Sequence, residues 1–219
     1  MNFFIIRSGV NFHKEVRVLS DHYYSREQNV ESKPVYWDFT LRNHRLKFKT
    51  DNGVFSKSEV DFGSRLLIET FQTPEVTGDI LDVGCGYGPI GLSIAKDTGR
   101  QVHMVDVNER ALSLAKENAN LNGVTNVSIY ESDRLSNVTN DEFAAILTNP
   151  PIRAGKQVVH EIFEQSYEHL KEDGELWVVI QKKQGAPSAM DKISEIFGNV
   201  ETVEKKKGYF ILRAIKYLT

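Results

Sequence analysis

The sequence contains one cysteine, no long apolar run and no strong excess of charge of either sign. Its single cysteine, Cys85, excludes an intrachain disulfide and fits a reducing compartment, so we expect a cytoplasmic protein. No stretch approaches the roughly 18 consecutive apolar residues of a membrane-spanning helix, and no membrane partner is expected. The apolar start at residues 1–6 is shorter than a signal-peptide core and lacks a basic leader.

The formal net charge of −3 argues against a protein that coats nucleic acid through its bulk charge. The charge is unevenly spread, because residues 1–57 carry ten Lys and Arg against six Asp and Glu, whereas the rest carry seventeen against twenty-four. A mildly basic N-terminal part joined to an acidic body permits a local phosphate-binding face. The 219 residues suit one domain with an appendage, and we predict an extension over residues 1–57 and a domain over residues 58–219.

Two runs with period-2 alternation lie before residue 51. Apolar residues alternate with polar ones from Val35 to Leu41, and again at Leu46 and Phe48. The polar turn at residues 42–44 separates the two runs. This pattern predicts a β-hairpin with one apolar face and one basic face.

From about Ser58, the predicted N-cap of the first helix, strand patterns alternate with helix patterns. Strands are expected near residues 80–83, 102–105, 127–130, 144–147, 176–180, 200–204 and 209–214. Helices are expected before the first of these strands, after the glycine segment 84–91 through residue 96, after an N-cap at residue 108 to about residue 122, and near residues 157–170 and 188–197. The pattern predicts an α/β, Rossmann-like fold whose seven-stranded sheet is mostly parallel and has an antiparallel last strand.

Three glycines, Gly84, Gly86 and Gly88, separate the first strand of the sheet from the following helix. Such a loop exposes its backbone to a ligand, and the helix start adds free N–H groups and a positive dipole end. Asp106 ends the second strand, where a carboxylate can accept hydrogen bonds from both hydroxyls of a ribose. These features predict a nucleotide-type ligand at the carboxyl ends of the strands. Cys85 is expected to be packed within the loop, because no histidine or other base stands beside it in the sequence.

The same glycines leave two cofactors open. Gly86-x-Gly88-x-x-Gly91 is a dinucleotide fingerprint, and Asp106 follows at a spacing that suits NAD. However, Asp82 precedes the loop, where a carboxylate would be unfavourable beside a pyrophosphate but favourable beside the ammonium group of a methionine moiety. Asp133 follows the third strand and can meet an adenine amino group. The arrangement therefore favours S-adenosylmethionine over NAD.

Asn149-Pro150-Pro151 follows the fourth strand of the sheet and is expected at the same cleft. The Asn149 side-chain oxygen and the Pro150 carbonyl can accept the two N–H bonds of an amide-like or exocyclic amine and direct its lone pair. Two prolines stiffen the backbone that carries these acceptors. Catalysis would then depend mainly on orientation. The alternative is a Pro-Pro turn that only ends the strand.

With these motifs the chain resembles the class I methyltransferases and, more narrowly, the RsmC-type small-subunit ribosomal RNA guanine-N2 methyltransferases. The resemblance extends over roughly residues 20–216. The more discriminating part is Gly53-Val54-Phe55-Ser56, followed by Asp61, Gly63 and Ser64. The other shared motifs are the glycine loop, Asp106-Val107-Asn108, Ser132-Asp133 and Asn149-Pro150-Pro151.

The resemblance implies S-adenosylmethionine as cofactor, no metal, and ribosomal RNA or a small-subunit particle as partner of a monomer or weak homodimer. Its catalytic residues would be Asn149, Pro150 and Pro151. The flipped base would be met by Phe55, Ser56, Ile152 and Arg153. The cofactor would be bound by Asp82, Gly84, Cys85, Gly86, Gly88, Asp106, Val107, Asn108, Ser132, Asp133 and Asn149.

The chain departs from the family pattern in two ways. Ile152 stands where members usually have an aromatic residue that stacks on the base, so Phe55 or another aromatic would have to replace it. Better-known members also carry a preceding, degenerate copy of the domain that helps to recognise RNA. The natural substitute here is the hairpin with Arg42, Arg45, Lys47 and Lys49, unless this face is only solvated. We expect the lysines at 182–183 and 205–207 to be solvated.

Three other functions are left open by the sequence. The acceptor could be a protein glutamine or an adenine amine. The chain could be an NAD-dependent oxidoreductase. It could also be a non-catalytic RNA-binding relative that retains the pocket.

Overall fold

A computed structural model describes residues 31–56 and 58–217 of the chain. The apolar start at residues 1–6 and residue 57, where we placed the domain boundary, lie outside the described residues.

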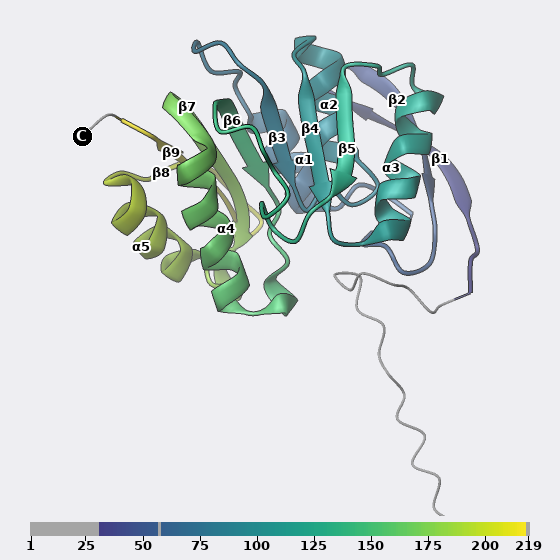
Figure 1. The fold of residues 1–219 in the computed structure, drawn as a ribbon. Helices are drawn as coiled ribbons and strands as arrows, with labels where there is room; N and C mark the ends of the chain where they lie inside the picture. Colours follow the sequence, from purple (N-terminus) through teal and green to yellow (C-terminus); the bar gives the residue numbers. More distant parts are fainter. Residues whose placement is uncertain (1–30, 57, 218–219) are drawn as a thin grey trace, which may run out of the picture.

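A seven-stranded sheet with the order β5-β4-β3-β6-β7-β9-β8 forms the centre of the fold (Figure 1). All neighbouring strands run parallel except β9, which is antiparallel to both β7 and β8. The predicted α/β fold with an antiparallel last strand is confirmed. The strands are β3 (Ile80–Val83), β4 (Val102–Asp106), β5 (Val127–Glu131), β6 (Phe143–Thr148), β7 (Leu170–Gln181), β8 (Glu201–Lys206) and β9 (Tyr209–Ile215).

Helices cover both faces of this sheet. One face packs against α1, α2 and α3 through side chains such as Ile80 and Trp177, and the other packs against α4 and α5 through side chains such as Leu81 and Leu176. Neighbouring residues of one strand thus serve opposite cores, as the period of 2 requires. The helices are α1 (Phe62–Thr70), α2 (Pro89–Thr98), α3 (Glu109–Leu121), α4 (Lys156–His169) and α5 (Ala186–Phe197), with short 3₁₀ turns η1 (Ile152–Ala154) and η2 (Lys182–Gln184).

Three element boundaries differ from the sequence prediction. The N-cap of α1 is Asp61 and not Ser58, because the Asp61 carboxylate accepts hydrogen bonds from the amides of Gly63 and Ser64. Strand β7 begins several residues early, because Leu170 already pairs with Phe143 of β6; the register then shifts before Glu175, and Asp173 in this irregular stretch has a positive φ of 58°. Helix α5 begins at Ala186, directly after Gly185.

The predicted hairpin is confirmed as β1 (Val35–Leu41) and β2 (His44–Thr50). Its turn is Arg42-Asn43, and both residues have positive φ, as a two-residue hairpin turn requires. The apolar face is part of the same core as α1, α2 and α3, and Leu41, Leu46 and Phe48 are fully buried. The boundary between extension and domain stays a prediction.

The outer edge of β2 is bonded to α3 through two asparagine side chains. Asn118 accepts a hydrogen bond from the Lys49 amide and donates one to the Lys49 carbonyl. Asn122, one helical turn later, makes the same pair with Lys47. The hairpin is therefore fixed to the domain by polar as well as apolar contacts.

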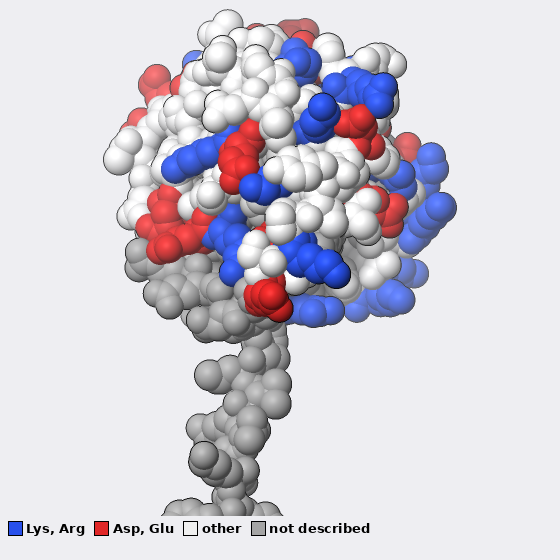
Figure 2. Space-filling view, turned by 90° about the vertical axis from the view of Figure 1, so that its right-hand side faces the viewer, with Lys and Arg blue, Asp and Glu red and all other residues white. Residues whose placement is uncertain are grey.

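The cations of the hairpin are mostly engaged within the protein. Arg42 bonds to the carbonyls of Ile68 and Phe71 and to the Asp97 carboxylate. Lys49 pairs with Glu117, and Arg45 pairs with Asp38. Figure 2 looks onto the side of the molecule where β1, β2 and α3 lie, and acidic and basic side chains stand beside one another over the middle of this side. Arg42 and Lys49 are thus engaged within the protein, whereas Arg45 and Lys47 remain exposed on the hairpin.

Candidate functional site

A cavity of about 370 Å³ lies at the carboxyl ends of β3, β4 and β6, where the strand order reverses between β4 and β6 on either side of β3. This is the ligand position in open parallel sheets, and the volume is in the range of small-molecule sites. The structure brings most of the predicted site residues together around it. The predicted residues that line it are Phe55, Ser56, Gly84, Cys85, Gly86, Asp106, Val107, Asn108, Ser132, Asp133, Asn149, Pro150 and Pro151.

The glycine loop forms the floor of the cavity. Gly84 and Gly86 have φ of 76° and 56°, and a Cβ atom at either position would meet nothing within 4 Å. Both glycines are therefore required by the left-handed backbone, and the space over them is left to a ligand. Gly91 has another role, because a Cβ atom there would lie 2.6 Å from Cγ of Met104. It lets α2 pack closely on β4.

Asp106 connects the loop to the start of α3. Its carboxylate accepts hydrogen bonds from the Gly86 amide at 2.8 Å and from the Asn108 amide at 2.9 Å. Burial raises the pKa of Asp106. Each carboxylate oxygen can accept a further hydrogen bond, so both remain able to bind a ribose hydroxyl.

Asp82 lies beneath the loop rather than on the cavity wall. Its side chain is 1% exposed, and Oδ2 accepts a hydrogen bond from the Gly91 amide at 2.8 Å. The other oxygen, Oδ1, is buried without a partner. Burial raises the pKa of Asp82 to about 7. An unpartnered buried acceptor next to an open glycine loop fits a ligand that carries a cationic ammonium group.

The Asp82→Asn substitution is expected to change how stability depends on pH. The folded protein holds the Asp82 proton more tightly than the unfolded chain, in which the pKa of this carboxyl group is near 3.8. The free energy of unfolding therefore decreases as the pH rises from 4 to 7, by up to about 4 kcal/mol from this group alone. Urea denaturation of the cofactor-free protein at several pH values should show this decrease in the wild type and a smaller one in the variant. Parallel stability curves for the two proteins would contradict the assignment.

Ser132, Asp133 and Arg134 follow β5 and line the end of the cavity where we expect the adenine. The Arg134 guanidinium pairs with Asp133 at 3.0 Å and with Glu161 of α4 at 2.6 Å. The Asp133 side chain is 61% exposed, so its carboxylate remains accessible to a ligand. Arg134 was not predicted from the sequence.

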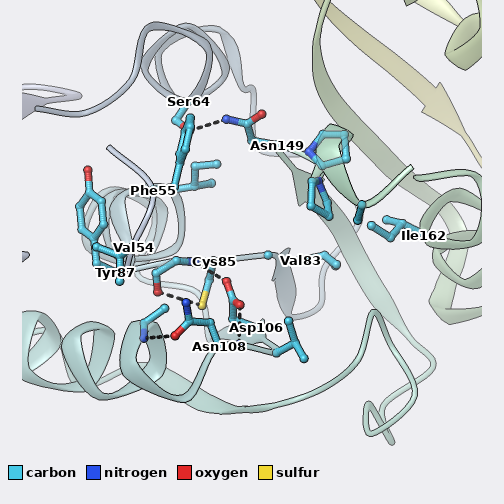
Figure 3. Close-up of a pocket in the computed structure, with 18 of the residues that line it drawn as sticks. Val54, Phe55, Ser64, Val83, Cys85, Tyr87, Asp106, Asn108, Asn149 and Ile162 are labelled. Atoms are coloured by element: carbon cyan, nitrogen blue, oxygen red, sulfur yellow. Dashed lines mark hydrogen bonds between the residues drawn. The ribbon is translucent and has the colours of Figure 1, made fainter. Parts of the chain in front are cut away.

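The amide of Asn149 is held by the start of α1. Its Nδ2 donates to the Ser64 hydroxyl at 3.0 Å (Figure 3). The same Nδ2 lies 3.4 Å from Oδ1 of Asp61. These contacts leave the Asn149 carbonyl oxygen as the side-chain atom that can accept a hydrogen bond from a ligand. Asp61 and Ser64 also line the cavity, and the sequence assigned neither of them to the site. The sequence pattern that could have identified them is Asp-x-x-Ser at the start of an apolar helix.

The segment from Asn52 to Ser56 covers one side of the cavity and is fastened at both ends. The Asn108 side chain donates to the Gly53 carbonyl, and Arg110 donates to the Asn52 carbonyl. The Ser56 hydroxyl donates to the Glu59 carbonyl. Phe55 is 44% exposed and lines the cavity with Val54 and Ser56.

Four predicted site residues do not line the cavity. Besides Asp82, Gly88 is the N-cap of α2, and a Cβ atom there would lie 2.9 Å from Leu92, so this position serves packing. Ile152 is half-buried and packs against the core cluster between the sheet and helices α4 and α5. Arg153 is exposed on η1. Ile152 and Arg153 belong to the 3₁₀ turn after Pro151, and of its three residues only Ala154 lines the cavity.

Cys85 is packed in the loop, as expected. It is 3% exposed, and burial raises the pKa of its thiol well above the ordinary value. A thiolate nucleophile is therefore disfavoured at this position.

Within residues 31–56 and 58–217, no group of three His, Cys, Asp or Glu side chains is placed to hold a metal ion. No helix of these ranges is both long and apolar enough to cross a membrane.

Comparison with known proteins agrees with the fold and the cavity. The sequence profile of the family described as the methyltransferase small domain matches residues 45–213. The chain belongs to this family. As a methyltransferase small domain of the class I, RsmC-like type, it uses S-adenosylmethionine, and the open glycine loop, Asp106 and the unpartnered Asp82 oxygen fit that cofactor. The NAD-dependent alternative is therefore wrong.

Several relatives of this methyltransferase small domain are known. It is 64% identical over 200 residues to the uncharacterized protein YbxB of Bacillus subtilis, covering 90% of this chain and 100% of YbxB. It is 31% identical to ribosomal RNA small subunit methyltransferase C of Vibrio vulnificus, over 83% of this chain and 53% of that protein. The chain thus spans about half the length of the small subunit methyltransferases C that it matches.

A solved structure also matches most of this chain, over about half of its own length. The Thermus thermophilus 16S rRNA N2 G1207 methyltransferase (RsmC), in complex with AdoMet and guanosine, matches with a TM-score of 0.76 and 25% identity. The match covers 86% of this chain and 52% of that one.

Proposed function

We propose that this chain transfers a methyl group from S-adenosylmethionine to the exocyclic N2 amine of a guanine in small-subunit ribosomal RNA. The observation that carries the proposal is the Asn149 amide, fixed by Asp61 and Ser64 in the wall of the cofactor cavity. The relatives named as small subunit methyltransferases, one of them solved with guanosine, support this choice of acceptor.

The acceptor chemistry explains why these residues are needed. The lone pair of a guanine amine is delocalised into the ring, so the nitrogen is a poor nucleophile. Asn149 Oδ1 and the Pro150 carbonyl would accept its two N–H bonds and direct the lone pair toward the methyl group. The bound cofactor supplies that methyl group on a positively charged sulfonium. The Pro150 carbonyl already accepts the Ile152 amide at 2.9 Å, which fixes its direction and leaves one lone pair for the substrate.

Among the described residues that line the acceptor end of the cavity, the only carboxylate is Asp61, which already caps α1. The amine becomes acidic once it carries the methyl group, and its proton can then leave to water. The protein therefore contributes mainly by orienting the amine toward the methyl group.

Phe55 is proposed to stack on the flipped base in place of the aromatic residue that Ile152 replaces. We expect Phe55→Ala to raise the KM for RNA roughly tenfold to a hundredfold, since stacking on an aromatic side chain contributes about 1–3 kcal/mol per base. Ile152→Ala should leave this KM nearly unchanged, because Ile152 does not line the cavity and packs half-buried against the core cluster. Steady-state kinetics with small-subunit RNA as the varied substrate would check both variants. Equal effects of the two substitutions would argue against stacking by Phe55.

The proposed function is tested with RNA from a strain that lacks this protein. Purified protein and isotopically labelled S-adenosylmethionine are incubated with that RNA, and the digested nucleosides are separated by mass spectrometry. We expect the label in N2-methylguanosine from small-subunit RNA. Label in N6-methyladenosine would overturn the proposal and assign the adenine amine, and absence of label from the RNA would overturn it as well.

A further inference from the structure

Five lysines from two distant segments meet at one corner of the sheet. Lys182 and Lys183 belong to η2, which follows β7, and Lys205, Lys206 and Lys207 lie at the end of β8 and in its turn to β9. The Lys182 amide donates to the Gly208 carbonyl at 2.8 Å, which joins the two segments. We call this group the lysine rim. The sequence had suggested that these lysines are only solvated.

The rim is a local excess of positive charge. All five side chains are exposed, and within the described part of the chain none of them forms an ion pair, whereas Arg42, Lys49 and Lys192 elsewhere are paired with carboxylates. The neighbouring Glu204 accepts a hydrogen bond from the Lys205 backbone amide. An unpaired cluster of this kind attracts a polyanion through solvent.

Two of the rim lysines are positioned over aromatic rings. Lys207 Nζ lies 4.9 Å from the centre of the Phe62 ring, and Lys205 Nζ lies 4.8 Å from that of Phe210. These contacts restrict the two long side chains without neutralising them. The ammonium groups therefore remain available to an anion.

The rim lies at the same edge of the sheet as the acceptor end of the cavity. Strand β7 is the parallel neighbour of β6, so Lys182 follows β7 at the edge where Asn149 follows β6. Phe62, which carries Lys207 over its ring, directly follows Asp61, and Asp61 contacts the Asn149 amide. Tyr209, next to the rim, packs on Phe62 with 5.4 Å between ring centres.

We propose that the lysine rim is the surface that binds the phosphates of the RNA next to the methylated nucleotide. A base that enters the cavity must leave its stack and brings its flanking phosphates to the cavity mouth. Phosphate contacts of this kind hold the register of the RNA and carry little sequence information. The inference rests on the proposed function and assigns this role to the rim rather than to the hairpin, whose cations are mostly paired.

The test compares two triple variants that remove the same charge. Lys205→Gln, Lys206→Gln and Lys207→Gln remove part of the rim. Lys33→Gln, Lys47→Gln and Lys116→Gln remove exposed lysines near the hairpin and α3, at the other end of the molecule (Figure 1). Binding of small-subunit RNA is measured by filter retention between about 50 and 200 mM salt. Thermal unfolding and calorimetric titration with S-adenosylmethionine verify that both variants fold and retain the cofactor site.

For the rim variant we expect RNA binding to be at least about tenfold weaker. The slope of log Kd against log salt concentration should also be smaller by about 2, because three phosphate contacts are lost. The hairpin-side variant should behave as the wild type. If RNA binding were weakened equally in the two variants, or only in the hairpin-side variant, the inference would be overturned. The proposed function would still stand if the wild-type protein methylated RNA. Absence of RNA methylation and binding in the wild type would instead contradict the proposed function.

Discussion

Replacing Asn149 with alanine is expected to reduce methyl transfer by about 100-fold or more, with retention of the fold and of most of the cofactor affinity. The substitution removes the side-chain oxygen proposed to accept an N–H bond of the amine, and misplacement of a reacting group by about 1 Å already has an effect of this size. Single-turnover rates with saturating RNA measure the chemical step, and calorimetry measures cofactor binding.

Ser64→Ala provides a graded control for this result. It removes the 3.0 Å bond to the Asn149 amide and leaves the contact with Asp61, so we expect a smaller loss in rate than for Asn149→Ala. If Asn149→Ala transferred methyl groups at the wild-type rate, the active site would lie elsewhere. If the wild-type protein bound RNA and cofactor but transferred no methyl group, the chain would be a non-catalytic RNA-binding relative instead.

Replacing Asp106 with alanine is expected to raise the dissociation constant of S-adenosylmethionine by at least about 100-fold. Two hydrogen bonds from ribose hydroxyls to a charged group contribute about 3–6 kcal/mol together. The substitution also leaves the Gly86 and Asn108 amides without their carboxylate acceptor, which loosens the loop that forms the cavity floor. Isothermal titration calorimetry checks the affinity, and circular dichroism checks the fold.

Asp133→Ala is the matched comparison at the other end of the cofactor. The Asp133 carboxylate is 61% exposed and already paired with Arg134, so solvent weakens its contribution, and we expect only a several-fold loss of affinity. Losses of equal size in the two variants would contradict the assignment of Asp106 to the ribose.

Features encoded by a short local pattern were predictable from the sequence. The alternation around Arg42-Asn43 predicted the hairpin, and the strand-helix rhythm predicted the sheet with its antiparallel last strand. The glycine loop, Asp106 and Asn149 were assigned to one cleft because parallel strands bring their carboxyl ends to one edge. None of these inferences required the packing of distant side chains.

Features that depend on long-range packing were not predictable. Asp82 stands in the expected place in the sequence, but the helix that follows covers it, and its carboxylate bonds to Gly91 rather than lining the cavity. Ile152 follows the prolines directly, yet in the 3₁₀ turn it packs half-buried against the core cluster and does not line the cavity. The pairing of Arg42 and Lys49 with acids 55 and 68 positions away, which no local pattern shows, leaves only Arg45 and Lys47 exposed among the four cations of the hairpin.

The two asparagines of α3 that bond β2 have a consequence for self-association. A hairpin beside a domain presents a row of free amides and carbonyls on its outer strand, and such an edge can recruit the same strand of another molecule. Asn118 and Asn122 occupy the amides and carbonyls of Lys47 and Lys49, so their side chains take the place of a further strand. The hairpin can therefore form one wall of the methyltransferase domain without offering this stretch of its edge as a template for aggregation.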